Sequence, residues 1–259
     1  NRFDVNGDND IERRFQRVDA KISLILHQAS LSHNIEKIIY VLGSDTFNAE
    51  FTQATTRGTP QENILTYHQS FKMICDHEVA EVNKLLRAAG EVEIIFVPGN
   101  HDKYVGWHMV NWLMAYFKDE PRLTIDDTPN YRKYVSYGAS AIMLNHGDRV
   151  KNAKLAGVFP IEYKDHWSEH KYFYVFTGDK HIESSENINS IKFYRVAAFT
   201  TSRSDWEDHG GISFRCAINA QASINGLPYH GQSDCFRDKE QRSSIDKKGN
   251  QFKKTMGNG

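Results

Sequence analysis

The chain has 259 residues, and its 32 Lys and Arg nearly balance 33 Asp and Glu, leaving a net charge of −1. This length fits one large α/β domain, and the balanced charge gives no case for broad attraction to nucleic acid. The three cysteines are widely spaced without a CxxC pair, which argues against a disulfide framework or a thiolate zinc site.

No apolar run approaches the roughly 20 residues that a membrane span needs. The polar, acidic residues 1–10 do not have the pattern of a signal peptide. We therefore expect a cytoplasmic protein, in the host cytoplasm if it is phage-encoded, without a membrane partner. Because the chain opens in polar sequence, we also expect native sequence, including a first strand, before Asn1.

Hydrophobic periodicity predicts alternating helices and strands along most of the chain. In chain order these are a helix at 11–28, a strand at 37–42, a helix at about 61–89, a strand at 92–97, a helix at 107–117, strands at 131–136 and 140–144, a helix at 151–157, and strands at 172–176, 191–196 and 212–218. The strands at 37–42 and 92–97 are expected to be buried on both faces. We predict one domain over 1–236 and a polar, disordered tail over 237–259.

Four of the predicted strands end in short turns that carry Asp, Asn or His. The turns contain Gly43-Ser44-Asp45, Gly99-Asn100-His101-Asp102, Asn145-His146-Gly147-Asp148 and Gly178-Asp179-Lys180-His181. Because sites in open α/β sheets form just beyond the carboxyl ends of strands, these turns are expected to converge.

The side chains in these turns are of the kinds that bind divalent metals. Asp45, Asn100, His146 and His181 supply oxygen and imidazole ligands that suit Mn, Fe, Zn or Ni. A carboxylate can bridge two cations, which share a hydroxide and clamp the attacking and leaving oxygens of a phosphoryl displacement. His101 is a candidate acid at the leaving group, and Asp102 a candidate acceptor of its ring N–H.

On these motifs the chain resembles the calcineurin-like metallophosphoesterase family, with a phage-type or nuclease-like member as the best match. Gly99-Asn100-His101-Asp102 matches the family's GNH(D/E) motif, and the order and strand-end placement of the other turns are similar over residues 37–181. The resemblance implies an α/β sandwich of two mixed β-sheets flanked by helices, with a dinuclear metal centre.

The resemblance also implies roles for single residues. Asp45 would bridge the metals, Asn100 and His146 would bind the second metal, and His181 the first. His101 would be the catalytic histidine, and Asn48 a nearby polar residue.

Two departures from the family pattern bear on these roles. No DxH motif follows an apolar strand, so two ligands of the first metal would be missing from residues 1–259. Asp179 stands where the family has the first His of GHxH; as a carboxylate it would still ligate a hard cation. Either the DxH motif lies before Asn1, or the chain binds one metal well and the other poorly. The expected cofactor is two divalent ions, with Mn first and Mg, Fe, Zn or Ni as alternatives.

The predicted function is hydrolysis of a phosphoester by a metal-bound hydroxide, with a phosphodiesterase or nuclease acting on DNA or RNA as first choice. A phosphomonoesterase or protein phosphatase is one alternative, and a non-catalytic scaffold with an incomplete metal site is another. Each turn taken alone also fits an ordinary turn or helix cap. Residues 166–170 match HxxEH, an inverted zinc-protease motif, but an exposed helix face explains that short pattern better, because the surrounding residues are polar and offer no obvious third ligand.

Overall fold

The computed structural model describes residues 11–63, 65–180, 183–196, 219–222 and 228–231. Its elements are α1 (Ile11–Ser30), β1 (Lys37–Gly43), α2 (Tyr67–Ala88), β2 (Glu91–Val97), α3 (Lys103–Tyr116), β3 (Leu123–Asp126), β4 (Arg132–Tyr137), β5 (Ser140–Asn145), α4 (Asn152–Glu162), α5 (Lys164–Trp167), β6 (Tyr172–Thr177), β7 (Ser184–Ile188), β8 (Ile191–Arg195), β9 (Asn219–Ala222) and β10 (Pro228–Gly231). The predicted strand at 212–218 and the predicted tail at 237–259 lie outside the described residues.

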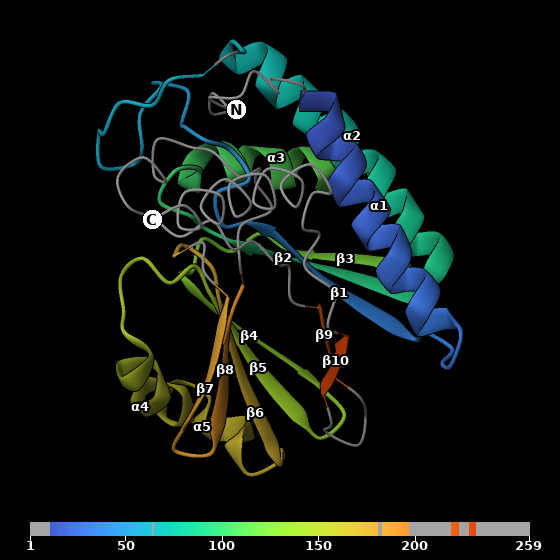
Figure 1. The fold of residues 1–259 in the computed structure, drawn as a ribbon, viewed down its shortest axis with the longest axis vertical. Helices are drawn as coiled ribbons and strands as arrows, with labels where there is room; N and C mark the ends of the chain where they lie inside the picture. Colours follow the sequence, from blue (N-terminus) through green and yellow to red (C-terminus); the bar gives the residue numbers. More distant parts are fainter. Residues whose placement is uncertain (1–10, 64, 181–182, 197–218, 223–227, 232–259) are drawn as a thin grey trace, which may run out of the picture.

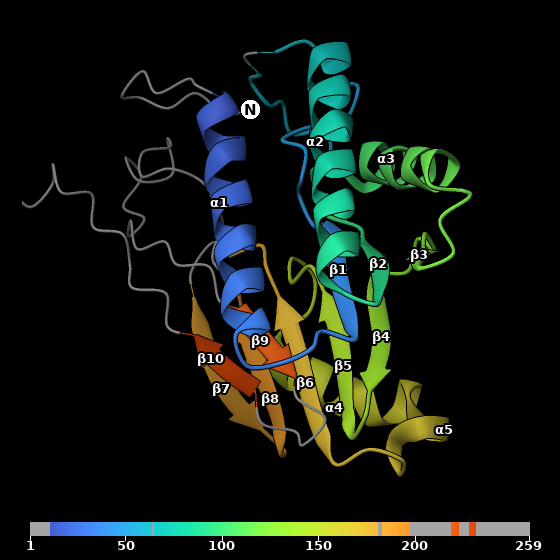
Figure 2. The same cartoon turned by 90° about the vertical axis from the view of Figure 1, so that its right-hand side faces the viewer.

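The described strands form two main sheets that pack face to face between helices (Figures 1 and 2). The first sheet has the order β1-β2-β3 and is parallel throughout, and the second has the order β4-β5-β6-β8-β7 and is mixed. Helices α1, α2 and α3 lie on the outer side of the first sheet, and α4 and α5 on the outer side of the second (Figure 1). The predicted α/β sandwich of two sheets flanked by helices is confirmed.

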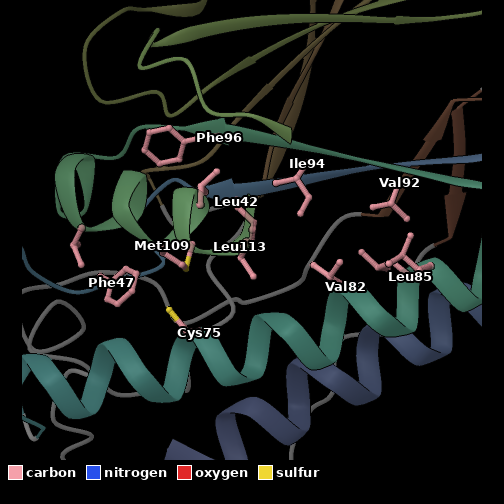
Figure 3. Packing of buried hydrophobic residues seen from close by; sticks show 13 residues of the cluster. Leu42, Phe47, Cys75, Val82, Leu85, Val92, Ile94, Phe96, Met109 and Leu113 are labelled. Atoms are coloured by element: carbon pink, nitrogen blue, oxygen red, sulfur yellow. The ribbon is translucent and has the colours of Figure 1, made fainter. Parts of the chain in front are cut away.

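Successive side chains of β2 pack on opposite faces of the first sheet, and both faces are covered. In β2, Ile94 and Phe96 face the helices, where they pack with Val82 of α2 and Met109 of α3 (Figure 3). The residue between them, Ile95, faces the other sheet. Because successive side chains of a strand point to opposite faces, a strand covered on both sides becomes an apolar run, as the sequence predicted for β2.

The same division holds for the second sheet. Met143 of β5 packs against Leu155 and Phe159 of α4, whereas Ile142 and Leu144 join the cluster between the sheets. All six residues of β5 are buried. The structure therefore has four layers, which are helices, the first sheet, the second sheet and helices, and each sheet is packed on both faces.

Several predicted boundaries are corrected by local contacts. Helix α2 begins at Tyr67 and not near residue 61, because Thr66 forms a capping box with Gln69. Strand β1 is at the edge of the described sheet: Ile38 packs on the helix side and Ile39 on the side of the other sheet, but only Leu42 is fully buried, so the predicted burial on both faces is incomplete. Strands β3 and β7 were not predicted, because β3 is short and β7 is a polar edge strand.

No helix in the described part of the chain has the length and apolar character to cross a membrane.

Candidate functional site

The candidate site lies where strands of both sheets end. β1 leads into Ser44 and Asp45, β2 into Asn100, β5 into His146, and β6 into Asp179. Two main-chain hydrogen bonds tie these turns together, from Ser44 N to Val97 O at 2.7 Å and from Gly178 N to His146 O at 2.8 Å. The polar turns therefore lie side by side.

His146 is the centre of this cluster and is 1% exposed. Its Nε2 lies 2.8 Å from Asn100 Oδ1, 3.2 Å from Asp45 Oδ2 and 3.7 Å from Asp179 Oδ1. Its Nδ1 lies 2.8 Å from Ser44 Oγ. One buried imidazole thus contacts side chains from all three of the other strand-end turns.

The charges of this cluster support one another. Burial opposes ionisation of His146, but the hydrogen bond and charge of Asp45, with Asp179, outweigh it and raise the histidine's pKa. Burial raises the pKa of Asp45, but the hydrogen bond and charge of His146 and the hydrogen bond from the His101 main-chain N–H lower it by more. The carboxylate of Asp45 and a cationic His146 therefore stabilise each other.

Asp179 has an incompletely satisfied carboxylate. Its Oδ2 is buried and has no hydrogen-bond partner, although Lys180 Nζ approaches it at 2.8 Å in an ion pair without hydrogen-bond geometry. A buried carboxylate oxygen normally has hydrogen-bond partners or a cation. In the described structure the Lys180 ammonium is the cation beside this oxygen.

The turn after β1 has an unusual backbone. Ser44 and Asp45 both have positive φ, at 55° and 73°, which is uncommon for residues with a side chain. Hydrogen bonds of Ser44 to Val97 and His146, and of Asp45 to His101, hold this conformation. Such backbone strain is concentrated at functional sites in proteins.

His101 lies beside the cluster and is held by main-chain contacts. Its N–H donates to Asp45 Oδ1 at 2.8 Å, and its ring Nδ1 lies 2.7 Å from Asn48 O. Because a carbonyl only accepts, Nδ1 carries the proton. Asn48 therefore acts on His101 through its carbonyl, while its side-chain amide donates to Glu62 O and Asn63 Oδ1.

The expected hydrogen bond from the His101 ring to Asp102 is corrected, because Asn48 O is the partner of Nδ1. The two oxygens of Asp102 accept instead from Gly99 N at 3.1 Å and Phe47 N at 3.4 Å. Burial, followed by the charge of Asp45, raises the pKa of Asp102 to about 7. Asp102 therefore joins two turns of the site through their main chain.

Sequence reasoning did not assign roles to two residues at this site. Ser44 was named only as part of its turn, and its contact with His146 joins positions 102 apart in the chain. Glu50 is 4% exposed and accepts from Tyr104 N and Val105 N in the first turn of α3. Its carboxylate fixes the start of the helix that follows Asn100, His101 and Asp102, and no local pattern indicates this.

The cluster fits a divalent cation in the types of its donors, which are carboxylate, amide and imidazole groups. Ligand atoms on an octahedral cation are about 3.0 Å apart, so the 2.8 and 3.2 Å contacts of His146 match such spacing and the 3.7 Å contact is longer. Yet among the described residues no three His, Cys, Asp or Glu side chains form a group that could hold a metal ion. The predicted ligand His181 lies outside those residues.

The HxxEH segment does not form the arrangement that a zinc protease needs. Helix α5 ends at Trp167, and the exposed ring of His166 pairs with Glu169 Oε2 at 3.0 Å. The ring of His170 donates to the carbonyl of His166. Each of the two histidines thus uses a ring nitrogen in a contact within the segment, as expected for an exposed turn.

Fold and site together define an α/β sandwich protein with a buried, polar cluster at the ends of strands from both sheets. No known protein family profile and no curated protein matches the chain.

Solved structures do show similarity. A single-mutant Vps29 from Entamoeba histolytica is 11% identical, covering 76% of this chain and 94% of its own, with a TM-score of 0.36. Wild-type Vps29 from the same organism, in complex with zinc, is 11% identical over 62% of this chain and 73% of its own, with a TM-score of 0.31. A conserved protein from Streptococcus pneumoniae, described as a predicted phosphoesterase, is 12% identical over 74% of this chain and 92% of its own, with a TM-score of 0.29. Because these TM-scores are low, we infer the site only from the strand order and contacts of this chain.

Proposed function

We propose that the chain is a metal-dependent phosphoester hydrolase that prefers diesters. The observation that carries the proposal is the convergence of Asp45, Asn100 and Asp179 on His146 from four separate strand ends. Two carboxylates, an amide oxygen and an imidazole in one place are ligands for a hard or borderline cation.

In this proposal Asp45, Asn100, Asp179 and His146 in its neutral form would hold the metal, which would displace the proton of His146. Mn is the first choice, and Mg, Fe, Zn and Ni are alternatives. Divalent cations supply Lewis-acid polarisation of the phosphoryl group and lower the pKa of the attacking water. Asp179 Oδ2 supports this assignment, because it is buried, accepts no hydrogen bond and already lies beside a cation, the Lys180 ammonium at 2.8 Å.

His101 is the proposed acid at the leaving group. Its Nδ1 is held by the carbonyl of Asn48, so Nε2 is the ring nitrogen that would act on a substrate. The hydrogen bond from its main chain to Asp45 fixes it beside the proposed metal ligands. A protonated Nε2 would donate its proton to the leaving oxygen as the phosphoester bond breaks.

The test is hydrolysis of bis-p-nitrophenyl phosphate against p-nitrophenyl phosphate with added Mn²⁺, with bound metal measured on the same sample. We expect the diester to be cleaved faster; faster cleavage of the monoester would favour the phosphomonoesterase alternative. His101→Asn should lower turnover by about 100-fold or more while bound metal is retained. The matched control is His108→Asn, at an exposed histidine of α3. Equal loss of metal and activity in His101→Asn would contradict the assigned role.

A second candidate is a metal-free binding or scaffold module. It is favoured by the contacts of His146, which already occupy oxygens of Asp45 and Asn100, and by the missing metal-holding group in the described residues. This candidate predicts no bound metal and no hydrolysis with any divalent ion. It also predicts that His146→Ala destabilises the fold, because buried carboxylate and amide oxygens lose their partner.

A further inference from the structure

A continuous row of basic and aromatic side chains runs beside the candidate site. We call it the basic ridge and define it by Arg57, Lys103, Tyr104, Tyr131 and Arg149. At one end, Arg57 and Arg149 share one acceptor, Asp148 Oδ2, at 3.3 and 3.4 Å. One carboxylate thus serves two guanidinium groups, which leaves an excess of positive charge.

Tyr131 lies in the middle of the ridge, between Arg149 and Lys103. The Arg149 guanidinium lies 3.7 Å from the centre of the Tyr131 ring, and Lys103 Nζ lies 5.4 Å from it. Lys103 Nζ also lies 5.0 Å from the centre of the Tyr104 ring. These cation–π contacts join side chains from three separate segments into one surface.

The ridge is attached to the site by residues close in the chain. Arg57 follows Thr56, whose N–H and Oγ1 donate to Asn100 O at 2.9 and 2.8 Å. Lys103 is two positions after His101, and Asp148 two positions after His146. A polymer bound along the ridge would therefore pass the proposed catalytic residues.

Charge and exposure indicate what the ridge can bind. The three cations of the ridge outnumber the two carboxylates in contact with it, Asp148 and the buried Glu50, on a chain whose net charge is −1. The Arg57 side chain is 66% exposed and that of Arg149 40%. Two exposed aromatic residues lie at the Lys103 end: Tyr104 at 52% and Phe51 at 58%, the latter next to Glu50, which contacts Tyr104 N.

We propose that the basic ridge binds a single-stranded nucleic acid and leads its backbone to the site. Guanidinium and ammonium groups would neutralise phosphates, and the exposed rings would stack on unpaired bases. Exposed aromatic rings among the cations favour a nucleic acid over an acidic peptide, which has no bases to stack. Delivery of a scissile phosphodiester rests on the proposed function, whereas binding itself does not.

The test is fluorescence anisotropy of a labelled oligothymidylate of about 15 nucleotides with the full chain in EDTA, so that no metal-dependent cleavage occurs. We expect Arg149→Ala to raise the Kd about five- to tenfold and to reduce the slope of log K against log salt by about one. Tyr104→Ala should raise the Kd about tenfold with little change in the salt slope, since it removes stacking and no charge. Arg149→Lys should keep the salt slope and weaken binding less than Arg149→Ala.

Lys72→Ala is the control, because Lys72 is an exposed lysine of α2 that pairs with Asp76 and makes none of the contacts that define the ridge. A Kd within about twofold of the unaltered chain for both Arg149→Ala and Tyr104→Ala would overturn the proposal. Equal competition by polyglutamate, together with no effect of Tyr104→Ala, would assign the ridge to an acidic peptide and also overturn it. Binding with these mutational effects, but without hydrolysis of the small diester, would uphold the ridge and reject the proposed function.

Discussion

At the scale of single residues, the turn at Gly99 shows how closely the segments of the site approach. A Cβ at this position would lie 2.1 Å from Asp45 Oδ1, 2.5 Å from Asp45 N and 2.6 Å from Asp102 Oδ1. No real side chain tolerates such distances, so the Asp45 turn and the Asn100 turn meet only because this residue is glycine. The GNHD motif therefore has a packing reason as well as a chemical one.

Gly99→Ala should lower the free energy of unfolding by about 1–3 kcal/mol, because the methyl group must displace main-chain atoms of Asp45. The measurement is urea unfolding followed by circular dichroism. Gly157→Ala in α4 is the matched control: nothing lies within 4 Å of its Cβ, so it should stabilise the helix by about 0.5–1 kcal/mol. Equal effects of the two substitutions would contradict the close approach at Gly99.

A second feature at this scale is the buried carboxyl of Glu78, which accepts from Tyr40 OH at 2.8 Å. Burial, opposed by this hydrogen bond and aided by the charge of Glu81, raises its pKa from 4.5 to about 7. The folded protein therefore holds this proton more tightly than the unfolded chain. Stability from Glu78 is complete below about pH 4.5, falls as the pH rises to about 7, and is constant above that.

Glu78→Gln should remove this loss, because the amide oxygen still accepts from Tyr40 and carries no charge. We expect the variant to gain about 1–3 kcal/mol relative to the unaltered chain when the pH is raised from about 5 to about 8. Urea unfolding at both pH values measures the difference, and Glu91→Gln, at an exposed position of β2, is the control. A gain of the same size in Glu91→Gln would show that Glu78 is not the cause. Asp102, whose pKa is also raised, contributes equally to both variants and cancels.

At the scale of elements, the start of α3 depends on a side chain from another segment. Asp102, the residue before the helix, makes no side-chain cap, and the carboxylate of Glu50 takes two of the free amides instead. The negative charge also lies at the positive end of the helix dipole. Helix α2 differs, because its capping box uses only Thr66 and Gln69.

Glu50→Ala should therefore lower the free energy of unfolding by about 1–2 kcal/mol, since two amides lose a charged acceptor. Glu50→Gln should cost less, because one oxygen remains to accept. The reference is Glu62→Ala, at an exposed glutamate of the same loop, which should change stability by less than about 0.5 kcal/mol. Similar losses for Glu50→Ala and Glu62→Ala in urea unfolding would remove Glu50 from this role.

At the scale of the whole molecule, a buried apolar cluster joins the two sheets. Ile95 and Val97 of β2 meet Ile142 and Leu144 of β5 and Tyr174 of β6 in that cluster. Because the four strand ends of the site belong to both sheets, this packing sets the distance between Asp45 and His146. The sheets are therefore expected to unfold as one cooperative unit.

Ile95→Ala should lower the free energy of unfolding by about 2–5 kcal/mol, because Ile95 is 1% exposed and leaves a cavity between the sheets. Tryptophan fluorescence and circular dichroism should report one coincident transition in urea. Ile161→Ala in α4, where the side chain is 71% exposed, should change stability by less than about 0.5 kcal/mol. Separate transitions by the two probes would show that the sheets are independent.

Local sequence was sufficient for the parts of the structure that depend on neighbours along the chain. The apolar runs predicted β2, β5 and β6, because strands covered on both faces contain few polar residues. The turns after them were recognised because polar and glycine residues interrupt each run at its carboxyl end. The convergence expected for these strand ends is seen in Asp45, Asn100 and His146, although Asp45 and Asn100 follow strands of one sheet and His146 a strand of the other.

The tertiary structure decided which atoms meet. The pairs Ser44–His146, Glu50–Tyr104 and Arg57–Asp148 are 102, 54 and 91 positions apart, and no helical or strand period relates such distant residues. The partner of the His101 ring was likewise decided by the turn that brings Asn48 O to it and leaves Asp102 to main-chain amides. Sequence by itself determined the elements and their polar ends, because those depend on local burial and backbone preference. Only packing of the two sheets decided the hydrogen bonds, the charges and the ridge, because these depend on distances between segments that the chain order does not specify.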